Sequence, residues 1–319
     1  MPGLVRAMTL VVVTRVHNAA AAAGGMRRGL AYARAYADVR HVAGGALASS
    51  PLHRATLGTL AVDAAGAFAL AGHAFALLGR IEVGADPAAA AELRIVAPLA
   101  KLATGRLAVG SASEYVESFG GAGYVEDTGV PRLLRDAQVL PIWEGTTNVL
   151  ALDVLRALTR EDAGAPLLSR LAAAVDLARP LSPALADTLA TAAAQLGDTI
   201  TAVTAELGAA AVLAGARGLA LRLPYALTAA LLVEHAAWGD EQAELAARLW
   251  GAAVAAARGD RRGRPPPPGP ALLNGRHGLG RAGGQRRGPP ATAARIAAGS
   301  SAGTNSSHQV APAAASSPR

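Results

Sequence analysis

The sequence predicts an all-α protein: an up-and-down helical bundle, followed by further helices and a disordered C-terminal tail. The first observation is composition, because 52% of the 319 residues are hydrophobic but only 3% are aromatic, and alanine dominates. Small side chains of high helix propensity suit closely packed helices. The second is the presence of Ser-Pro and Asp-Pro pairs, which are typical of helix N-termini. The third is the lack of an alternating apolar pattern typical of strands.

The first three helices are expected to be long. The first covers residues 9–40, although Gly24 and Gly25 interrupt its pattern at roughly 1 kcal/mol each relative to alanine. Ser50–Pro51 and Asp86–Pro87 begin the second and third helices, with the polar residue as the N-cap and proline at the first helical position.

The remaining helices are expected to be shorter. Residues 131–139 form one, and Thr146 or Thr147 caps another that runs to about residue 160. Later breaks are expected at Pro180–Pro183, near Gly208, at Pro224 and at Gly239–Asp240. The predicted domains are a bundle at 9–160, an additional Ala/Leu-rich helical region at 166–257 and a disordered tail at 259–319.

The net charge of +7 belongs to the tail and not to the helical body. Ten arginines and a single acid from Arg258 onward give the tail a charge of +9, which leaves the body at −2. This Arg-, Pro- and Gly-rich composition cannot bury enough apolar surface to offset the entropy of ordering. Weak non-specific contact with nucleic acid through counterion release is one interpretation of the tail. A solvated low-complexity end is the other.

Several classes of protein and site are excluded by composition. The chain has no cysteine, which rules out disulfides and cysteine-type zinc sites. The seven histidines show no metal-ligand spacing, so no metal site is expected. No charge-free apolar stretch of about 20 residues is present, so we expect no membrane span and a cytoplasmic protein.

Residues 120–147 carry most of the functional signal. A glycine-rich turn at Gly120, Gly121 and Gly123 is followed by an Arg-rich helix, and then by Glu144 between a tryptophan and a glycine. Each element alone has a structural explanation: glycines end helices, Arg–Asp pairs bridge a surface, and a carboxylate favours the positive end of the next helix. The informative observation is their combination in this order.

This combination resembles the C-terminal signature of the flavin-dependent acyl-CoA dehydrogenases. The Trp-Glu-Gly-Thr form, continued by Asn148 and by residues 153–156, is most similar to the branch linked to the DNA-alkylation response. The resemblance covers about residues 10–160 well and 166–257 loosely, and it implies the helical bundle of the family's C-terminal domain. The N-terminal helical domain and the middle β-domain of the family have no counterpart here.

The resemblance implies a catalytic role for Glu144. In the family a glutamate at this place removes the α-proton of an acyl-CoA thioester, while the β-hydrogen leaves as hydride to the flavin. Such a base needs a raised pKa, which burial beside an apolar acyl chain provides. The structural alternative is a carboxylate that only stabilises the N-terminus of the next helix.

The resemblance also implies FAD and a homo-oligomer. Arg40 corresponds to a family arginine that contacts the flavin pyrophosphate of a neighbouring subunit, and Ala43 replaces the family's phenylalanine nearby. The three glycines would let the backbone approach the adenosine diphosphate portion. Thr146 and Asn148 are candidate donors to flavin oxygens, or helix caps.

Two functions of different classes follow from the sequence. The first is an FAD-dependent dehydrogenase acting on CH–CH groups of an acyl-CoA, with the chain as part of the enzyme. The second is a non-catalytic helical remnant or a DNA-associated stress-response protein that binds phosphates through its basic tail.

Overall fold

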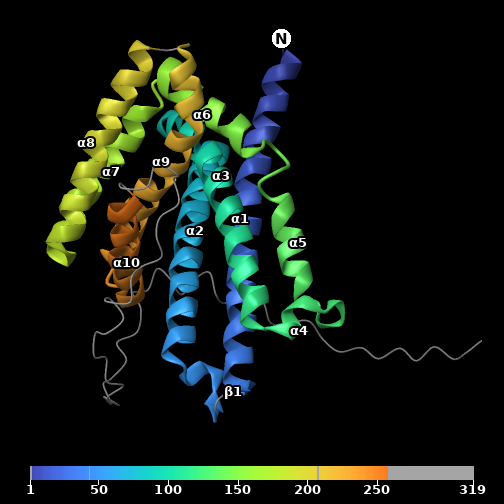
Figure 1. Ribbon diagram of the computed structural model, residues 1–319. Coiled ribbons are helices and arrows are strands. Elements are labelled where there is room, and N and C mark those ends of the chain that lie inside the picture. Colours follow the sequence, from blue (N-terminus) through green and yellow to red (C-terminus); the bar gives the residue numbers. More distant parts are fainter. Residues whose placement is uncertain (1, 43, 207, 258–319) are drawn as a thin grey trace, which may run out of the picture. The chain divides into compact units, whose positions relative to one another are not determined.

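Ten α-helices account for most of the residues that this computed structural model describes, which are 2–42, 44–206 and 208–257 (Figure 1). The all-α prediction is confirmed. The helices are α1 (Pro2–Val39), α2 (Pro51–Gly84), α3 (Pro87–Ser118), α4 (Gly121–Tyr124), α5 (Pro131–Val139), α6 (Thr147–Arg160), α7 (Gly164–Leu181), α8 (Pro183–Ala205), α9 (Ala210–Ala236) and α10 (Glu241–Ala257). The predicted tail at 259–319 and Ala43 lie outside the described residues.

A short hairpin joins α1 to α2. Strand β1 (His41–Val42) pairs antiparallel with β2 (Gly45–Ala46), with His41 opposite Ala46. A single turn of 3-10 helix at Leu47–Ser49 then leads into α2. The all-helix prediction does not include this hairpin.

The predicted helix starts are confirmed where a side chain caps the helix. The Ser50 hydroxyl accepts a hydrogen bond from the His53 amide, and Pro51 is the first residue of α2. The Asp86 carboxylate accepts bonds from the amides of Ala88 and Ala89, both at 3.0 Å. These caps satisfy amides that have no partner within the helix.

The single helix predicted over residues 9–40 is confirmed despite its two glycines, and the break predicted at Pro224 is wrong. Helix α1 continues through Gly24 and Gly25, and α9 continues through Pro224, which is buried within it. Helix α3 likewise includes Pro98 as a buried residue. The local preference of glycine and proline against helix is modest compared with the packing of a whole helical face, so tertiary contacts override it.

Alanine and leucine build the core that these helices share. Helices α1, α2 and α3 pack against one another, α5 packs on α1 and α3, and α9 packs on α2, α3, α6 and α7. Gly66 of α2 allows the Trp250 indole of α10 to approach, because an added Cβ would lie 2.4 Å from the ring. The indole nitrogen of Trp250 donates to the Tyr225 carbonyl at 2.9 Å.

Helices α2 and α9 are long and apolar enough to cross a membrane by length and composition alone. Half of the apolar window in α2 and 67% of that in α9 are buried inside the bundle. Core helices of a bundle pass the same test of length and composition, so the test alone is weak evidence for a membrane span.

A buried ion-pair network joins α2 and α3 to the later helices. Glu92 of α3 accepts hydrogen bonds from His73 of α2 and Arg170 of α7, both at 2.8 Å. Arg170 also pairs with Glu234 of α9 at 2.5 Å. Because Glu92 is only 14% exposed, solvent screens these pairs weakly.

Acidification is expected to weaken this network. Burial alone would raise the pKa of Glu92, but hydrogen bonds from His73 and Arg170 lower it to about 2. The stabilising effect of the carboxylate is therefore complete above its unfolded-state pKa and is lost as the pH falls from about 5 to about 2. We expect Glu92→Gln to lower the unfolding free energy by roughly 1–2 kcal/mol at pH 7 and by less at pH 2. Urea unfolding followed by circular dichroism measures both differences, and equal differences would contradict the prediction.

Candidate active site

The signature carboxylate lies in the turn between α5 and α6. Glu144 has a φ of 56° and Gly145 a φ of 114°. A positive φ is uncommon for a residue with a side chain and is strained, and such strain is frequent at functional sites. The Glu144 side chain is half-buried. The turn therefore presents the candidate base in a conformation that its own backbone does not favour.

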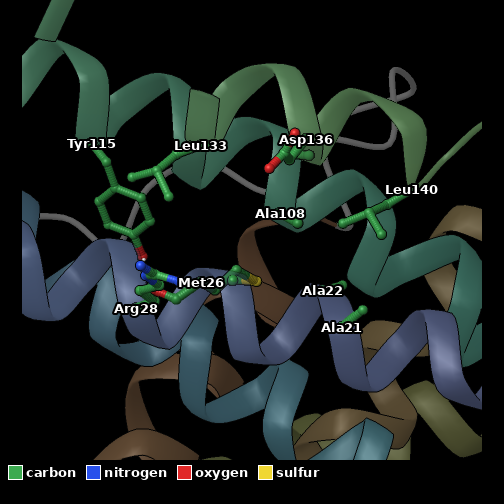
Figure 2. Close-up of a pocket in the computed structure, with 12 residues that line it drawn as sticks. Ala21, Ala22, Met26, Arg28, Ala108, Tyr115, Leu133, Asp136 and Leu140 are labelled. Carbon is green, nitrogen blue, oxygen red and sulfur yellow. Dashed lines mark hydrogen bonds between the residues drawn. The ribbon is translucent and has the colours of Figure 1, made fainter. Parts of the chain in front are cut away.

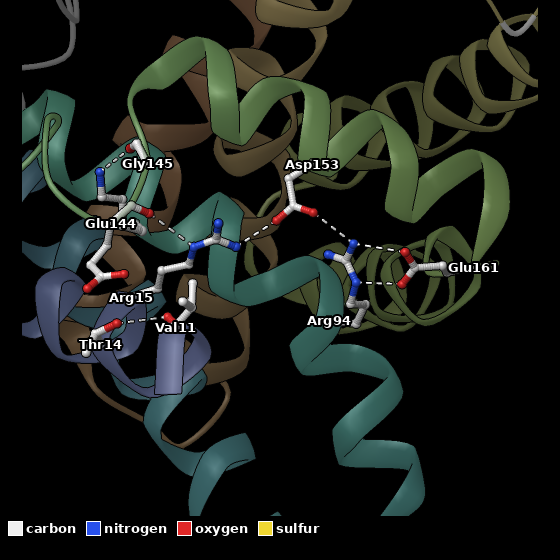
Figure 3. A network of polar contacts seen from close by, with 9 residues as sticks. Val11, Thr14, Arg15, Arg94, Glu144, Gly145, Asp153 and Glu161 are labelled. Atoms are coloured by element: carbon white, nitrogen blue, oxygen red, sulfur yellow. Dashed lines mark hydrogen bonds and ion pairs between the residues drawn. The ribbon is translucent and has the colours of Figure 1, made fainter. Parts of the chain in front are cut away.

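Two cationic side chains hold the backbone of this turn (Figure 3). Arg15 Nε of α1 donates to the Glu144 carbonyl at 3.3 Å. Lys101 Nζ of α3 donates to the Gly145 carbonyl at 2.5 Å. Neither contact is predictable from local sequence, because the partners are 129 and 44 residues apart.

Arg15 is itself held by a chain of ion pairs. Asp153 of α6 binds Arg15 at 2.6 Å through one oxygen and Arg94 of α3 at 2.9 Å through the other. Arg94 continues to Glu161, with its closer contact at 2.5 Å. Asp153 belongs to the signature, and in the structure its carboxylate bridges two guanidinium groups beside the turn.

Removal of the Asp153 carboxylate is expected to destabilise the fold. Asp153→Ala leaves Arg15, which is 9% exposed at its side chain, without its carboxylate partner. Loss of one member of a buried pair costs roughly 3 kcal/mol because the other charge stays desolvated. The control is Asp136→Ala, which breaks only the exposed Arg132–Asp136 pair and should cost less than about 0.5 kcal/mol. Urea unfolding of both variants measures the two values, and equal losses would contradict the prediction.

Lys101 is the single lysine of the chain, and its side chain is completely buried. Burial, together with the positive charge of Arg15, lowers the pKa of Lys101 to about 8, and the negative charge of Glu144 offsets part of this effect. The lysine thus lies within electrostatic reach of the candidate base.

The predicted FAD residues fall into two groups at opposite ends of α1. Thr146 and Asn148 lie near the end that contains Arg15, together with the predicted base Glu144. Arg40 follows the last residue of α1, about 37 Å from Arg15 at 1.5 Å per helical residue. Figure 1 shows α4 and β1 at this far end, and α6 near the other.

The glycine-rich turn lies with Arg40 at the far end. Tyr36 of α1 stacks on Phe119, which precedes Gly120, with ring centroids 4.5 Å apart. One chain therefore brings Arg40 close to the glycine turn, but it does not bring either of them to Glu144.

The three glycines of the turn have different structural roles. Gly120 has a φ of 59°, which favours glycine. At Gly123 an added Cβ would lie 1.9 Å from the Val116 carbonyl oxygen, so close packing of α4 on α3 requires glycine there. Gly121 has open space in place of a side chain. Within the described chain, neither packing nor backbone conformation requires a glycine at this position.

Thr146 and Asn148 are both exposed at the start of α6. Thr146 occupies the N-cap position, but its side chain makes no capping hydrogen bond, so the expected side-chain cap is wrong. The Asn148 side-chain oxygen accepts a bond from Arg217 of α9 at 2.7 Å. Arg217 is a site neighbour that sequence reasoning missed, since it lies 69 residues away.

A cavity of about 240 Å³ lies between α1, α3 and α5, and Leu140 beside the Glu144 turn is part of its wall (Figure 2). Its surface is mainly small and apolar, with Arg28 and Asp136 as the charged residues. Other lining residues include Ala21, Ala22, Gly25, Met26, Ala108, Ala112, Tyr115 and Leu133. Within the described part of the chain, no group of three or more potential metal ligands is found.

The family model for the acyl-CoA dehydrogenase C-terminal domain matches residues 2–159. Residues 2–159 belong to the acyl-CoA dehydrogenase C-terminal domain family. The match covers α1 to α6 and includes the Glu144 turn together with Arg15, Arg94 and Lys101.

Individual relatives agree with this assignment. Acyl-CoA dehydrogenase family member 11 of Caenorhabditis elegans is 47% identical over 161 residues, which are 50% of this chain and 26% of that protein. Putative acyl-CoA dehydrogenase AidB of Escherichia coli K12 is 37% identical over 144 residues, 45% of this chain and 26% of that protein. The chain thus spans about a quarter of the length of these curated relatives.

A solved structure extends the likeness beyond α6. The crystal structure of Caenorhabditis elegans ACDH-11 in complex with C11-CoA superposes with a TM-score of 0.71 at 36% identity. The superposition covers 75% of this chain and 42% of the ACDH-11 chain. Since 75% exceeds the share matched by the family model, part of α7–α10 also follows this fold.

Proposed function

We propose that the chain forms the C-terminal helical part of an FAD-dependent acyl-CoA dehydrogenase that oxidises a CH–CH bond, with Glu144 as the base. The observation that carries the proposal is the Glu144 turn: a carboxylate at positive φ, beside two buried cations, within the family signature. The chain spans only a fraction of its relatives' length, so the complete site requires parts of the enzyme outside the matched region.

The surface around Glu144 suits an apolar substrate and a flat cofactor. Apolar side chains are exposed on both sides of the turn. Exposed apolar surface of this kind favours contact with an apolar ligand over contact with water. The exposed side chains are Val139, Ile142, Trp143, Val149 and Leu152. Trp143, adjacent to the base and 41% exposed, offers an aromatic surface against which a flavin ring can pack.

An acyl-CoA is the substrate class that the comparison favours. The C11-CoA named with the ACDH-11 structure is a ligand of that relative, and we carry its class over to this chain. Abstraction of the α-proton by Glu144 requires the carboxylate within hydrogen-bond reach of that proton. The two cations behind the turn bind its backbone carbonyls and so hold the base in place for this step.

The residues present fit FAD. Arg40 is exposed and has no ion-pair partner among the described residues, so its guanidinium fork is free to bind pyrophosphate. Gly121 leaves open space for a ligand to approach the backbone. When bound, FAD accepts the hydride that leaves the substrate. The distance between Arg40 and Glu144 within one chain favours a homo-oligomer in which Arg40 of one subunit completes the Glu144 site of another.

The test is flavin retention by the purified chain, alone and joined to the remaining domains of the enzyme. After incubation with FAD and desalting, retained absorption bands at roughly 370 and 450 nm are expected for the joined form. Addition of C11-CoA should then bleach the band near 450 nm. Arg40→Gln should reduce retention, whereas Arg132→Gln, which removes an exposed arginine paired only with Asp136, should not. Failure of the joined form to retain flavin would refute the proposal.

A further inference from the structure

The turn that carries Glu144 is held from two helices at two successive carbonyl groups. Arg15 of α1 binds the Glu144 carbonyl (Figure 3), and Lys101 of α3 binds the Gly145 carbonyl. Both residues of the turn have positive φ. Since φ and ψ at Glu144 determine where its side chain points, a donor at each carbonyl fixes that direction.

A role in packing alone does not account for Lys101. Its side chain is completely buried, and a buried ammonium group loses hydration that a methionine of similar length would not. No carboxylate lies at ion-pair distance from Lys101 within the described ranges, and the Gly145 carbonyl is its acceptor. The hydrogen bond to the turn is therefore the feature that requires a cationic donor at this position.

Arg15 differs from Lys101 because it is oriented by a second residue. The Asp153 carboxylate binds its Nη1 at 2.6 Å and leaves Nε directed at the Glu144 carbonyl. Two donors of different origin thus act on neighbouring peptide groups: one is fixed by an ion pair and the other by complete burial.

We propose that Lys101 and Arg15 are positioning residues that clamp the Glu144–Gly145 turn and direct the Glu144 carboxylate towards the reacting carbon. The inference rests on the proposed function for the role of Glu144. The clamp itself concerns the backbone, so it can be tested without any reaction.

Cleavage by a glutamate-specific protease measures the clamp in the chain itself. The Glu144–Gly145 bond becomes accessible when the turn opens, and Lys101→Met is expected to accelerate its cleavage at least tenfold. Cleavage after the exposed Glu126 serves as an internal reference and should not change. The matched control is Arg106→Met, which removes an exposed cation one and a half turns further along α3. Equal cleavage rates in Lys101→Met and the control would overturn the clamp.

A spectroscopic measurement applies if Lys101→Met does not fold. Because the chain has one lysine, selective ¹⁵N labelling gives a single side-chain ammonium signal. A coupling across the hydrogen bond between Lys101 Nζ and the Gly145 carbonyl carbon is expected in the wild-type chain. Its absence would overturn the inference.

The positioning role is tested separately in the FAD-loaded assembly. Lys101→Met should lower kcat tenfold or more with little change in KM, because the substrate still binds while the base is misdirected. Faster cleavage of the turn with an unchanged kcat would retain the clamp but overturn positioning. Full activity of Glu144→Gln would instead remove the proposed base and leave the protease result intact, so the two failures are distinguishable.

Discussion

Glu144→Gln is expected to lower kcat of the FAD-loaded assembly by about 10²- to 10⁴-fold, the range that a positioned general base contributes. The amide keeps the size of the side chain but cannot accept the α-proton. Flavin retention should remain, since the change leaves the carbonyl bonds to Arg15 and Lys101 in place. Rapid-mixing absorbance near 450 nm with C11-CoA would follow the reductive step directly.

The control for this variant is Glu82→Gln. Glu82 is exposed at the end of α2, in a helix that does not contribute to the turn. The kcat of the Glu82→Gln assembly should stay within twofold of the wild-type value. A Glu144→Gln enzyme that reduces flavin at the wild-type rate would assign the base to another group.

Gly123→Ala is expected to lower the unfolding free energy by roughly 2–4 kcal/mol, as overpacking against rigid backbone does. An alanine Cβ would lie 1.9 Å from the Val116 carbonyl oxygen and 2.8 Å from its carbon. Neither atom belongs to a flexible side chain, so α4 would have to move away from α3.

Gly121→Ala is the matched control for Gly123→Ala. It lies in the same short helix, and an added Cβ meets nothing within 4 Å. We expect a change of less than about 1 kcal/mol, because alanine also restricts the unfolded chain. Urea unfolding of the two variants gives the comparison, and a larger loss for Gly121→Ala would show that contacts outside the described chain fill the open space.

The sequence predicts those features of the fold that depend on neighbouring residues. Ser50–Pro51 and Asp86–Pro87 mark helix starts because their capping bonds are local. Pro224 misleads because its effect depends on the surrounding helices, which bury it within α9. A local penalty can be read from sequence, but the packing that outweighs it cannot.

The residues of the candidate site likewise divide into those that the sequence predicts and those that only the structure shows. Glu144 is visible from sequence because its neighbours form a recognisable order. Arg15 and Lys101 reach the turn, and Arg217 reaches Asn148, from other helices, and these contacts leave no local pattern. The separation of Arg40 from Glu144 becomes apparent only once Arg15, at the other end of α1, is seen to bind the Glu144 carbonyl.

This separation has a genetic consequence in an oligomer of the proposed kind. If each site combines Glu144 of one subunit with Arg40 of another, a dimer formed from one Arg40→Gln chain and one Glu144→Gln chain has both defects in one site and an intact second site. Two proteins of reduced activity should therefore regain activity when they are refolded together, up to about a quarter of the wild-type level under random pairing. Complementation between alleles would then report the subunit arrangement without any further structure.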